Sequence, residues 1–330
     1  MGEVQARFTA SDVAVVIPTY GREQVLLDTV RACLDQKPPP GEIIVVDQTP
    51  RHEPRTEEFL RSWSESGQVR LIRRDKPSQP AAANCALLAA ARPLVLFLDD
   101  DIVPAGDLVE RHALAHGDTD VWAVVGQILQ PGQEPVEYVP AAPDGRLRTH
   151  LDFRFNSSRR CRIENCMSGN VSVRREKALA VGGFDENFRY TVAYRFDTEF
   201  GRRICRHGGK ILFEPTATLR HLRASRGGTR SASNHLTSAK PDHSIGDYYF
   251  AILYGRRMEV FSYAAQRLVR SVATRFHLRH PWWIPPKLIG ELRGLIGAVG
   301  LAKHGQRLIT ESRLDDSQIS ATAVPGKSVP

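Results

Sequence analysis

Residues Leu94-Val-Leu-Phe-Leu-Asp-Asp-Asp101 join a short, continuous apolar run to three consecutive carboxylates. Such a run predicts a strand that is buried on both faces of a sheet. Three adjacent carboxylates repel one another, and a strand end that tolerates them usually has a cation nearby. Oxygen ligands favour Mg²⁺ or Mn²⁺ over zinc. The alternative is that one aspartate caps a helix beginning near Pro104.

Strand and helix patterns alternate before this stretch. We expect strands at 13–17, 42–46 and 69–73 and helices at 24–34, 56–64 and 80–91. This alternation predicts an α/β fold with a doubly wound, mostly parallel sheet flanked by helices. Ligands bind such sheets beyond the carboxyl ends of the strands. Asp47 follows the second strand and should face the same crevice as Asp99–Asp101, although it could instead be a turn residue that bonds its own backbone.

The rest of the chain is less regular. We expect strands at 122–130 and 210–213, helices at 176–181 and 198–206, and loops at 131–156 and 223–244. Helical spacing returns over 245–303, broken by Pro281-Trp-Trp-Ile-Pro-Pro286. The expected organisation is a domain at 1–243, with a nucleotide-binding half at about 12–130 and an acceptor half at about 131–243, followed by a helical region at 244–310 and a disordered tail at 311–330.

Composition and missing motifs narrow the function. The chain has 330 residues, 42% of them hydrophobic, and a formal net charge of +8, which fits a globular protein with anionic partners. No GxGxxG follows the first strand and no P-loop is present, which argues against dehydrogenases and P-loop NTPases. No nucleic-acid-binding motif occurs. With no signal peptide and no apolar run of about 18 residues, we expect a cytoplasmic protein without a transmembrane helix.

Several short motifs stand in a specific order and spacing. They are Val15-Val-Ile-Pro-Thr-Tyr-Gly-Arg22, Ile44-Val-Val-Asp47, Leu96-Phe-Leu-Asp-Asp-Asp101, Gly169-Asn-Val-Ser-Val-Arg-Arg175, Val181-Gly-Gly-Phe-Asp-Glu186, Phe196-Asp-Thr-Glu-Phe-Gly-Arg202 and the late His221. On these residues the chain resembles the family 2 glycosyltransferases, which have the GT-A fold. The resemblance covers about residues 12–225.

The resemblance implies roles for individual residues. The residues implied to bind the nucleotide-sugar are Pro18, Thr19, Tyr20, Arg22, Asp47 at the base, Asn84, Asp99, and Asp100 near the ribose. Those implied to hold Mg²⁺ or Mn²⁺ on the diphosphate are Asp101 and His221. Asp197 would be the general base. Those implied at the acceptor entrance or in a lid are Gly169, Asn170, Arg226 and Arg230.

The expected reaction follows from these roles. A divalent cation stabilises a diphosphate leaving group, and a carboxylate accepts the proton of the incoming hydroxyl. A single base opposite the leaving group implies inversion at the anomeric carbon, with a UDP- or dTDP-sugar donor and a glycan or lipid-linked acceptor. Each role has a plainer alternative: Asp197 could be a helix N-cap, His221 a packed side chain, and the arginines beside Gly227-Gly228 a basic surface loop.

The chain departs from the family pattern at three places. Gln48-Thr49-Pro50 follows Asp47, where the family has an acidic residue or Asn and then Gly-Ser. Ala83-Asn84 replaces an Arg-Asn pair, and Lys76 or Gln79 could compensate for the lost contact. Phe196-Asp197 replaces a Glu-Asp pair, so the implied base is present without its acidic neighbour.

The C-terminal region mixes aromatic residues with arginines over 248–301. This composition predicts contact with an anionic membrane surface, near a lipid-linked acceptor. The alternative is a helical subdomain that packs on the sheet. Two other functions are a nucleotidyltransferase, which needs a glycine-rich basic loop after the first strand, and a non-catalytic nucleic-acid-binding protein, which the basic charge alone suggests.

Overall fold

A nine-stranded sheet forms the centre of the protein in a computed structural model, which describes residues 8–188, 194–228 and 234–310. The strand order is β3-β2-β1-β4-β8-β6-β9-β5, and β7 pairs with β9. The strands are β1 (Val13–Thr19), β2 (Glu42–Asp47), β3 (Arg70–Arg73), β4 (Leu94–Leu98), β5 (Ile102–Pro104), β6 (Val121–Leu129), β7 (Cys161–Ile163), β8 (Asn170–Arg174) and β9 (Lys210–His221).

The parallel part of the sheet is the N-terminal half. β3, β2, β1 and β4 are mutually parallel neighbours, as are β6 and β9. β8 runs antiparallel to both β4 and β6 and so joins the two parallel groups. The carboxyl ends of β1, β2 and β4 therefore meet at one edge of the sheet.

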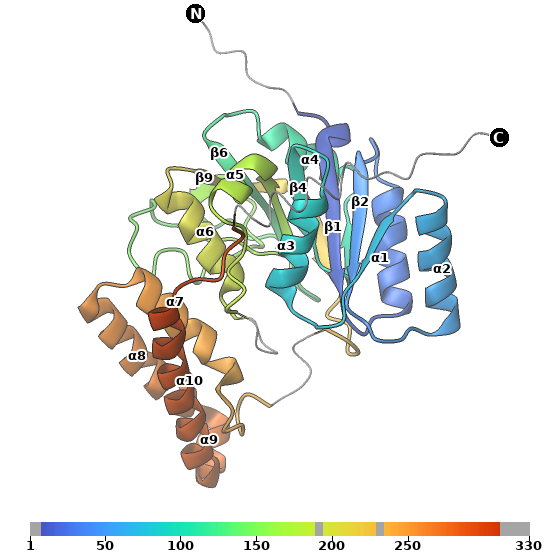
Figure 1. Ribbon diagram of the computed structural model, residues 1–330. Coiled ribbons are helices and arrows are strands. Elements are labelled where there is room, and N and C mark those ends of the chain that lie inside the picture. The colour runs from blue at the N-terminus through green and yellow to red at the C-terminus, as the bar shows by residue number, and fades with distance from the viewer. Residues whose placement is uncertain (1–7, 189–193, 229–233, 311–330) are drawn as a thin grey trace, which may run out of the picture.

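Helices cover both faces of the sheet (Figure 1). They are α1 (Gln24–Leu34), α2 (Pro54–Glu65), α3 (Gln79–Ala89), α4 (Leu108–Ala115), α5 (Arg175–Ala180), α6 (Phe196–Arg206), α7 (Ile245–Tyr254), α8 (Arg257–Val272), α9 (Arg275–Arg279) and α10 (Ile284–His304). Short 3₁₀ turns are η1 (Ala10–Asp12), η2 (Pro241–His243) and η3 (Pro281–Trp283).

The two faces carry separate hydrophobic cores because strand side chains alternate in direction. In β1, Val13 and Val15 pack with α1, α2 and α4, whereas Ala14 and Val16 pack on the other face with α3, α5 and α6. All four are fully buried, which explains why the strand reads as a continuous apolar run.

The C-terminal helices divide into a buried part and a projecting part. α7 packs into the core through Tyr248 and Tyr249, both fully buried. α8, α9 and α10 extend away from the sheet (Figure 1). The last turns of α10 pack on the same core through Ala298, so α7 and this end of α10 form the expected packing subdomain. The rest of α8, α9 and α10 leaves a separate surface.

The predicted elements of the first half are confirmed, with small shifts at their ends. The expected strand at 210–213 instead runs on to His221, since β9 continues to pair with β6 beyond a register shift at Gly126/Gln127. The short strands β5, β7 and β8 were not predicted. No helix begins near Pro104, which lies in β5 instead, so the helix-cap explanation of the aspartates is wrong.

Candidate active site

A cavity of about 690 Å³ lies at the carboxyl edge of the parallel strands. Its walls come from the ends of β1 and β4, the start of α6, and the loops after β6 and β9. The lining residues are Pro18, Thr19, Tyr20, Arg22, Gln48, Gln79, Asp99, Asp100, Asp101, Ile128, Gln130, Met167, Ser168, Gly169, Asp197, His221, Arg223, Ala224, Ser225, Gly227 and Gly228. Most of the predicted site residues therefore share one cavity.

Asp100 lines the cavity but is only 8% exposed. Thr19 Oγ1 donates a hydrogen bond of 2.7 Å to Asp100 Oδ2, and Arg22 Nε donates one of 3.2 Å to Oδ1. Burial raises the pKa of Asp100 to about 6; Arg22 and Thr19 oppose the rise, while the charges of Asp101 and Asp99 add to it. The neighbouring carboxylates thus add to the effect of burial in disfavouring the ionised form of Asp100.

Asp101 and His221 are brought together by strand pairing. β5 runs antiparallel to β9, and Ile102 is the register partner of His221. His221 Nε2 lies 3.4 Å from Asp101 Oδ1 and 3.4 Å from Asp99 Oδ2. Residues 120 positions apart in sequence thus present one nitrogen and two oxygens to the same space.

These oxygen and nitrogen atoms are of the kinds that bind divalent cations. Among the described residues, no set of three His, Cys, Asp or Glu side chains is arranged to enclose an ion. Mg²⁺ in proteins is commonly held by one or two carboxylates together with substrate phosphates and water, so an incomplete protein shell fits such an ion. Asp101 and His221 are the side chains here that suit that role.

Gly169 and Asn170 have different surroundings. A Cβ on Gly169 would lie 2.4 Å from Asp99 Oδ2, so only glycine leaves room for that carboxylate at the cavity wall. Asn170 is fully buried and does not line the cavity. Its amide donates hydrogen bonds of 3.0 Å to the carbonyls of Gln127 and Ala217, so the expectation that it lies at the acceptor entrance is wrong.

Asp197 lies in the first turn of α6 and faces the cavity. The helix begins at Phe196 with Arg195 as its N-cap residue, so Asp197 is not the cap. Its carboxylate accepts hydrogen bonds from Ser168 N (3.3 Å) and Thr198 N (2.8 Å). The partial positive charge at a helix N-terminus favours an ionised carboxylate there.

The loop after β9 closes onto the end of β1. Arg22 donates to the carbonyls of Ala224 (2.9 Å) and Arg226, and Gly228 N donates to Tyr20 O at 2.7 Å. The side chain of Arg226 is not among the cavity-lining groups. Arg230 lies outside the described residues. The described part of the predicted lid is thus docked through backbone atoms.

Two predicted donor contacts lie elsewhere. The Asp47 side chain is fully buried, and its carboxylate accepts hydrogen bonds from Thr49 N (2.9 Å), His52 (3.0 Å) and Arg73 (2.6 Å). Burial would raise the pKa of Asp47, but the bonds from His52 and Thr49 hold it below its ordinary value. The expectation that Asp47 opens into the crevice is wrong, and Gln48 lines the cavity instead.

Asn84 is the second misplaced residue. It is buried in α3, where its amide donates to Phe184 O (2.8 Å) and to Glu186 (3.1 Å), and its oxygen accepts from Phe184 N (2.7 Å). These contacts hold the 181–186 turn against α3 and leave no group for a donor. Gln79, at the start of the same helix, does line the cavity, whereas Lys76 does not.

Ile128, Gln130, Met167 and Ser168 also line the cavity and were not predicted. Gln130 directly follows β6, and its position beyond a strand end could have indicated it. Met167 and Ser168 precede the quoted Gly169 motif, but only the pairing of β8 with β4 brings that turn beside Asp99.

Comparison with known proteins decides the family. The sequence model described as "Glycosyl transferase family 2" matches residues 14–182, more than half of the chain. This chain belongs to glycosyl transferase family 2. It is therefore a glycosyltransferase. A search of proteins with curated descriptions found no match.

Solved structures share the GT-A fold at low identity. A crystal structure of TarS residues 1–349 from S. aureus is 16% identical, with a TM-score of 0.58, and the match covers 92% of this chain and 82% of that one. A crystal structure of GalNAc-T7 with UDP, GalNAc and Mn²⁺ is also 16% identical, with a TM-score of 0.55 and 84% of this chain covered. The match spans 59% of the GalNAc-T7 chain.

Proposed function

We propose that this family 2 glycosyltransferase inverts the anomeric carbon as it moves a sugar from a UDP- or dTDP-sugar to an acceptor hydroxyl. The observation that carries the proposal is that Asp101 and Asp197 line a single cavity of about 690 Å³. One carboxylate suits the diphosphate side of the donor and the other suits the acceptor side. The acceptor would be a polysaccharide, glycolipid or glycoconjugate precursor.

The donor half of the site fits a metal-bound diphosphate. Asp101 and His221 would hold Mg²⁺ or Mn²⁺, which stabilises the diphosphate leaving group as a Lewis acid when bound. Thr19, Tyr20 and Gln48 line the side of the cavity formed by the ends of β1 and β2, where a base and ribose would lie. The GalNAc-T7 structure, crystallised with UDP and Mn²⁺, supports this donor class by its fold.

Asp197 would act on the acceptor. Its carboxylate takes the proton of the acceptor hydroxyl as that oxygen bonds to the anomeric carbon, and the bond from that carbon to the diphosphate oxygen breaks. Attack from the side opposite the leaving group inverts the configuration. Hydrogen bonds from Ser168 N and Thr198 N hold the carboxylate in one orientation.

A donor screen tests this proposal. We would measure the melting temperature of the full chain with UDP-, dTDP- and GDP-sugars, each with and without Mn²⁺, and then the release of nucleoside diphosphate. A UDP- or dTDP-sugar should raise the melting temperature only with Mn²⁺, because a ligand of the folded state stabilises it. No shift with any nucleotide-sugar would contradict the proposal.

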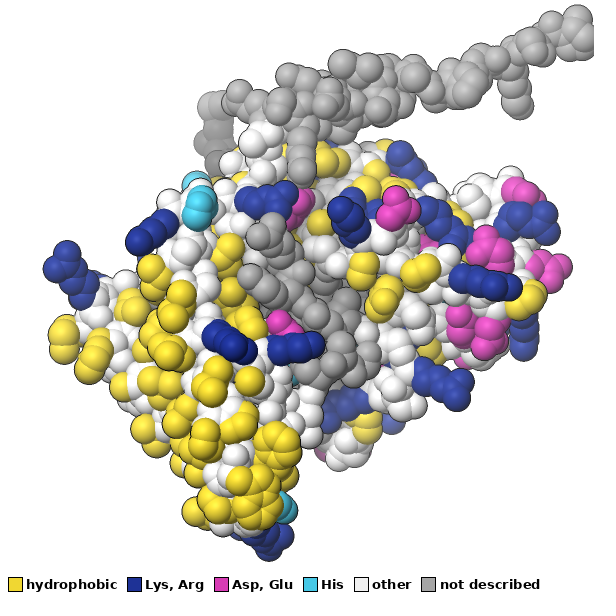
Figure 2. Space-filling model, turned by 60° about the horizontal axis from the view of Figure 1, so that its bottom comes forward, with side chains coloured by type: hydrophobic (Ala, Val, Ile, Leu, Met, Phe, Trp, Pro, Cys, Tyr) yellow, Lys and Arg dark blue, Asp and Glu magenta, His cyan; other side chains and the backbone are white. Residues whose placement is uncertain are grey.

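We also propose that the projecting helices bind an anionic membrane surface. Figure 2 shows hydrophobic side chains gathered over them. The exposed residues that form this apolar face are Met258, Phe261, Val269, Leu278, Trp282, Trp283, Leu288, Ile289, Leu292, Ile296 and Val299. Ile245–His304 holds nine Lys or Arg against three Asp or Glu, which suits anionic headgroups.

The expected aromatic contacts are only partly on this surface. Tyr248, Tyr249, Phe250 and Tyr263 are buried, so they belong to the core. Phe261 is 70% exposed and Trp282 is 63% exposed, and these remain candidates for the lipid interface. Within the described residues, no helix is long and apolar enough to cross a bilayer, so the proposed contact is with its surface.

A further inference from the structure

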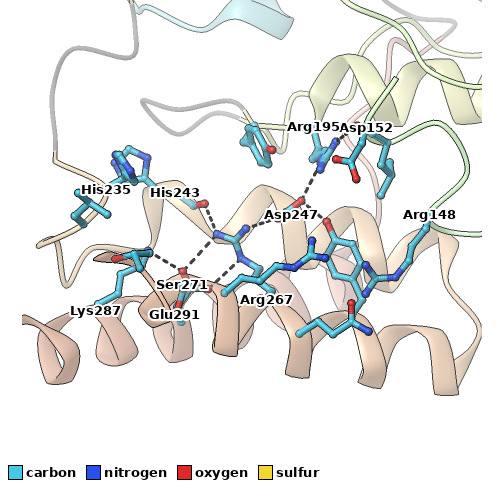
Figure 3. A pocket seen from close by; sticks show the side chains of 17 residues that line it. Arg148, Asp152, Arg195, His235, His243, Asp247, Arg267, Ser271, Lys287 and Glu291 are labelled. Atoms are coloured by element: carbon cyan, nitrogen blue, oxygen red, sulfur yellow. Dashed lines mark hydrogen bonds and ion pairs between the residues drawn. The ribbon is translucent and has the colours of Figure 1, made fainter. Parts of the chain in front are cut away.

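A second cavity, of about 730 Å³, lies between the projecting helices and the acceptor half. α8 and α10 form one wall and the segment 148–152 with Tyr194 and Arg195 forms another (Figure 3). The charged lining residues are Arg148, Asp152, Arg195, Asp247, Arg267, Arg270, Lys287 and Glu291. Five are cationic and three anionic, so the cavity carries a positive surplus.

Most of these charges satisfy one another. Asp247 accepts hydrogen bonds from Arg195 Nε (2.9 Å) and from Arg267, which approach from opposite sides in Figure 3. Glu291 accepts from Arg267 Nε at 3.0 Å and lies 2.8 Å from Lys287 Nζ. This chain of ion pairs ties α6, α7, α8 and α10 together and forms a fixed wall.

Arg148 and Arg270 are the cations left over. Neither makes an ion pair within the part of the chain that the structure describes, and both are exposed. The Arg148 guanidinium lies 5.0 Å from the centre of the Tyr263 ring, which orients it along the cavity. Asp152 also lacks an ion pair within the described residues, so the groups free to meet a ligand are two positive charges and one negative.

The cavity adjoins the candidate base. Arg195 lines it and has a left-handed backbone, with φ of 72°, held by the bond to Asp247. Asp197, two residues later, lines the donor cavity. Two residues of chain span at most about 7 Å between Cα atoms, so residues close together at the start of α6 line both cavities.

The other side of the cavity leads to the apolar face. α8 turns Arg267 and Arg270 toward the cavity and Phe261 and Val269 toward solvent. α10 likewise turns Glu291 inward and Leu292 outward. A ligand held here would thus lie between a surface suited to lipid and a carboxylate suited to a sugar hydroxyl.

We propose that this second cavity binds the phosphate or diphosphate group of a lipid-linked sugar acceptor, with Arg148 and Arg270 as its charged contacts. The inference rests on the proposed function, whose acceptor it specifies. Arginine recognises phosphate with paired hydrogen bonds, and two arginines on facing walls suit one such group. The lipid chain would leave toward the apolar face, and the sugar would reach toward Asp197.

Binding of a soluble probe tests the proposal. We would titrate farnesyl diphosphate, inorganic pyrophosphate and farnesol into the full chain by calorimetry. The test variant is Arg148→Gln/Arg270→Gln, and the matched control is Arg257→Gln/Arg279→Gln, which removes two exposed arginines of α8 and α9 outside the cavity. We expect farnesyl diphosphate to bind about tenfold or more weakly to the test variant and normally to the control. Asp152→Asn should bind it more tightly, because a repelling charge is removed.

The other outcomes overturn the proposal. If the wild type and the test variant bind farnesyl diphosphate with equal affinity, the two arginines do not contact it. Equal affinity for pyrophosphate and farnesyl diphosphate assigns the cavity to a free phosphate and not to a lipid-linked one. Farnesol binding as tightly as farnesyl diphosphate shows that the anion is not recognised.

A separate titration distinguishes this failure from failure of the proposed function. UDP and dTDP with Mn²⁺ are titrated into the same proteins. If a nucleotide binds and the affinity for farnesyl diphosphate is the same with and without the two arginines, only the acceptor inference is wrong. If no protein binds a nucleotide, the proposed function itself fails.

Discussion

The guanidinium of Arg22 lies against the carboxylate of Asp101, with Nη2 3.1 Å from Oδ2. The same guanidinium reaches Asp100, and all three side chains are buried. Arg22 therefore connects the aspartate triplet to the loop after β9, whose carbonyls at Ala224 and Arg226 it also contacts. It neutralises part of the charge that a metal ion and a donor would meet.

Removing this guanidinium should destabilise the fold. In Arg22→Ala, two buried carboxylates lose their cationic partner, so we expect the free energy of unfolding to fall by about 3 kcal/mol. Urea unfolding measures this change. Arg61→Ala, which removes an exposed pair with Glu65 at 4.0 Å, is the control and should change stability by less than about 1 kcal/mol. Equal effects of the two substitutions would contradict the role given to Arg22.

Gly227 should be needed for the loop to dock. Its φ is 77°, and a Cβ there would lie 2.3 Å from Gly21 O. We expect Gly227→Ala to push the loop off β1 and to weaken nucleotide binding about tenfold, measured by calorimetry. Gly67→Ala is a matched control because its φ is 73° and nothing lies within 4 Å of its Cβ position. If both variants bind nucleotide as the wild type does, the docked loop has no part in binding.

Two buried histidines should make stability depend on pH. Burial lowers the pKa of His112 to about 4 and that of His116 to about 3. Their unfolded pKa is about 6.5, so the unfolded state binds more protons below that pH, and their contribution is lost as pH falls from 6.5 toward 4. Above pH 6.5 it is fully present.

The contribution can be isolated with one variant. Buried Asp100 has a raised pKa and titrates in the opposite sense over this range, so the wild-type profile alone mixes the two effects. We would measure the free energy of unfolding of the wild type and of His116→Gln at each pH and take the difference. As pH falls from 6.5 to 4, this difference should shrink by about 1.4 kcal/mol for each pH unit over which His116 is protonated in the unfolded state and neutral in the folded state. A difference that stays constant with pH would show that His116 is not held neutral.

The apolar face should bind anionic lipid. We expect the wild type to float with vesicles of mixed anionic and zwitterionic lipid, and Trp282→Ser/Leu292→Ser to float much less, because apolar area and basic charge both contribute to such binding. Val139→Ser, at a 61% exposed site of the transferase domain, is the control. Wild-type protein that does not float with the vesicles would contradict the membrane proposal. So would wild-type protein that elutes as a dimer held by this face.

The strand ends were predictable and the contacts across the sheet were not. Continuous apolar runs located β1, β2 and β4, so the Asp99–Asp101 site followed from local pattern. The approach of His221 to Asp101 depends on the pairing of β5 with β9, and β5 is only three residues long. Such a pairing leaves almost no sequence signal.

Polar residues beside a predicted site were the main source of error. Asp47 and Asn84 have side chains of the kinds that bind ligands, but their hydrogen-bonding groups bind other protein residues that the sequence does not reveal. Asp47 binds His52 and Arg73, and Asn84 binds the backbone of Phe184. The positions of the strands predict which edge of the sheet holds the site. Which side chains at that edge face the ligand depends on how each one packs, and the sequence does not show this.

One comparison of rate with affinity tests whether Asp197 is the general base. The measurement is the rate of nucleoside diphosphate release with a donor and acceptor that the wild type uses, set beside the dissociation constant of the nucleotide with Mn²⁺. Asp197→Asn keeps the shape of the side chain and removes its basicity, so we predict a loss of about 100-fold or more in rate with nucleotide binding unchanged. An Asp197→Asn protein that transfers sugar at the wild-type rate would show that Asp197 is not the general base.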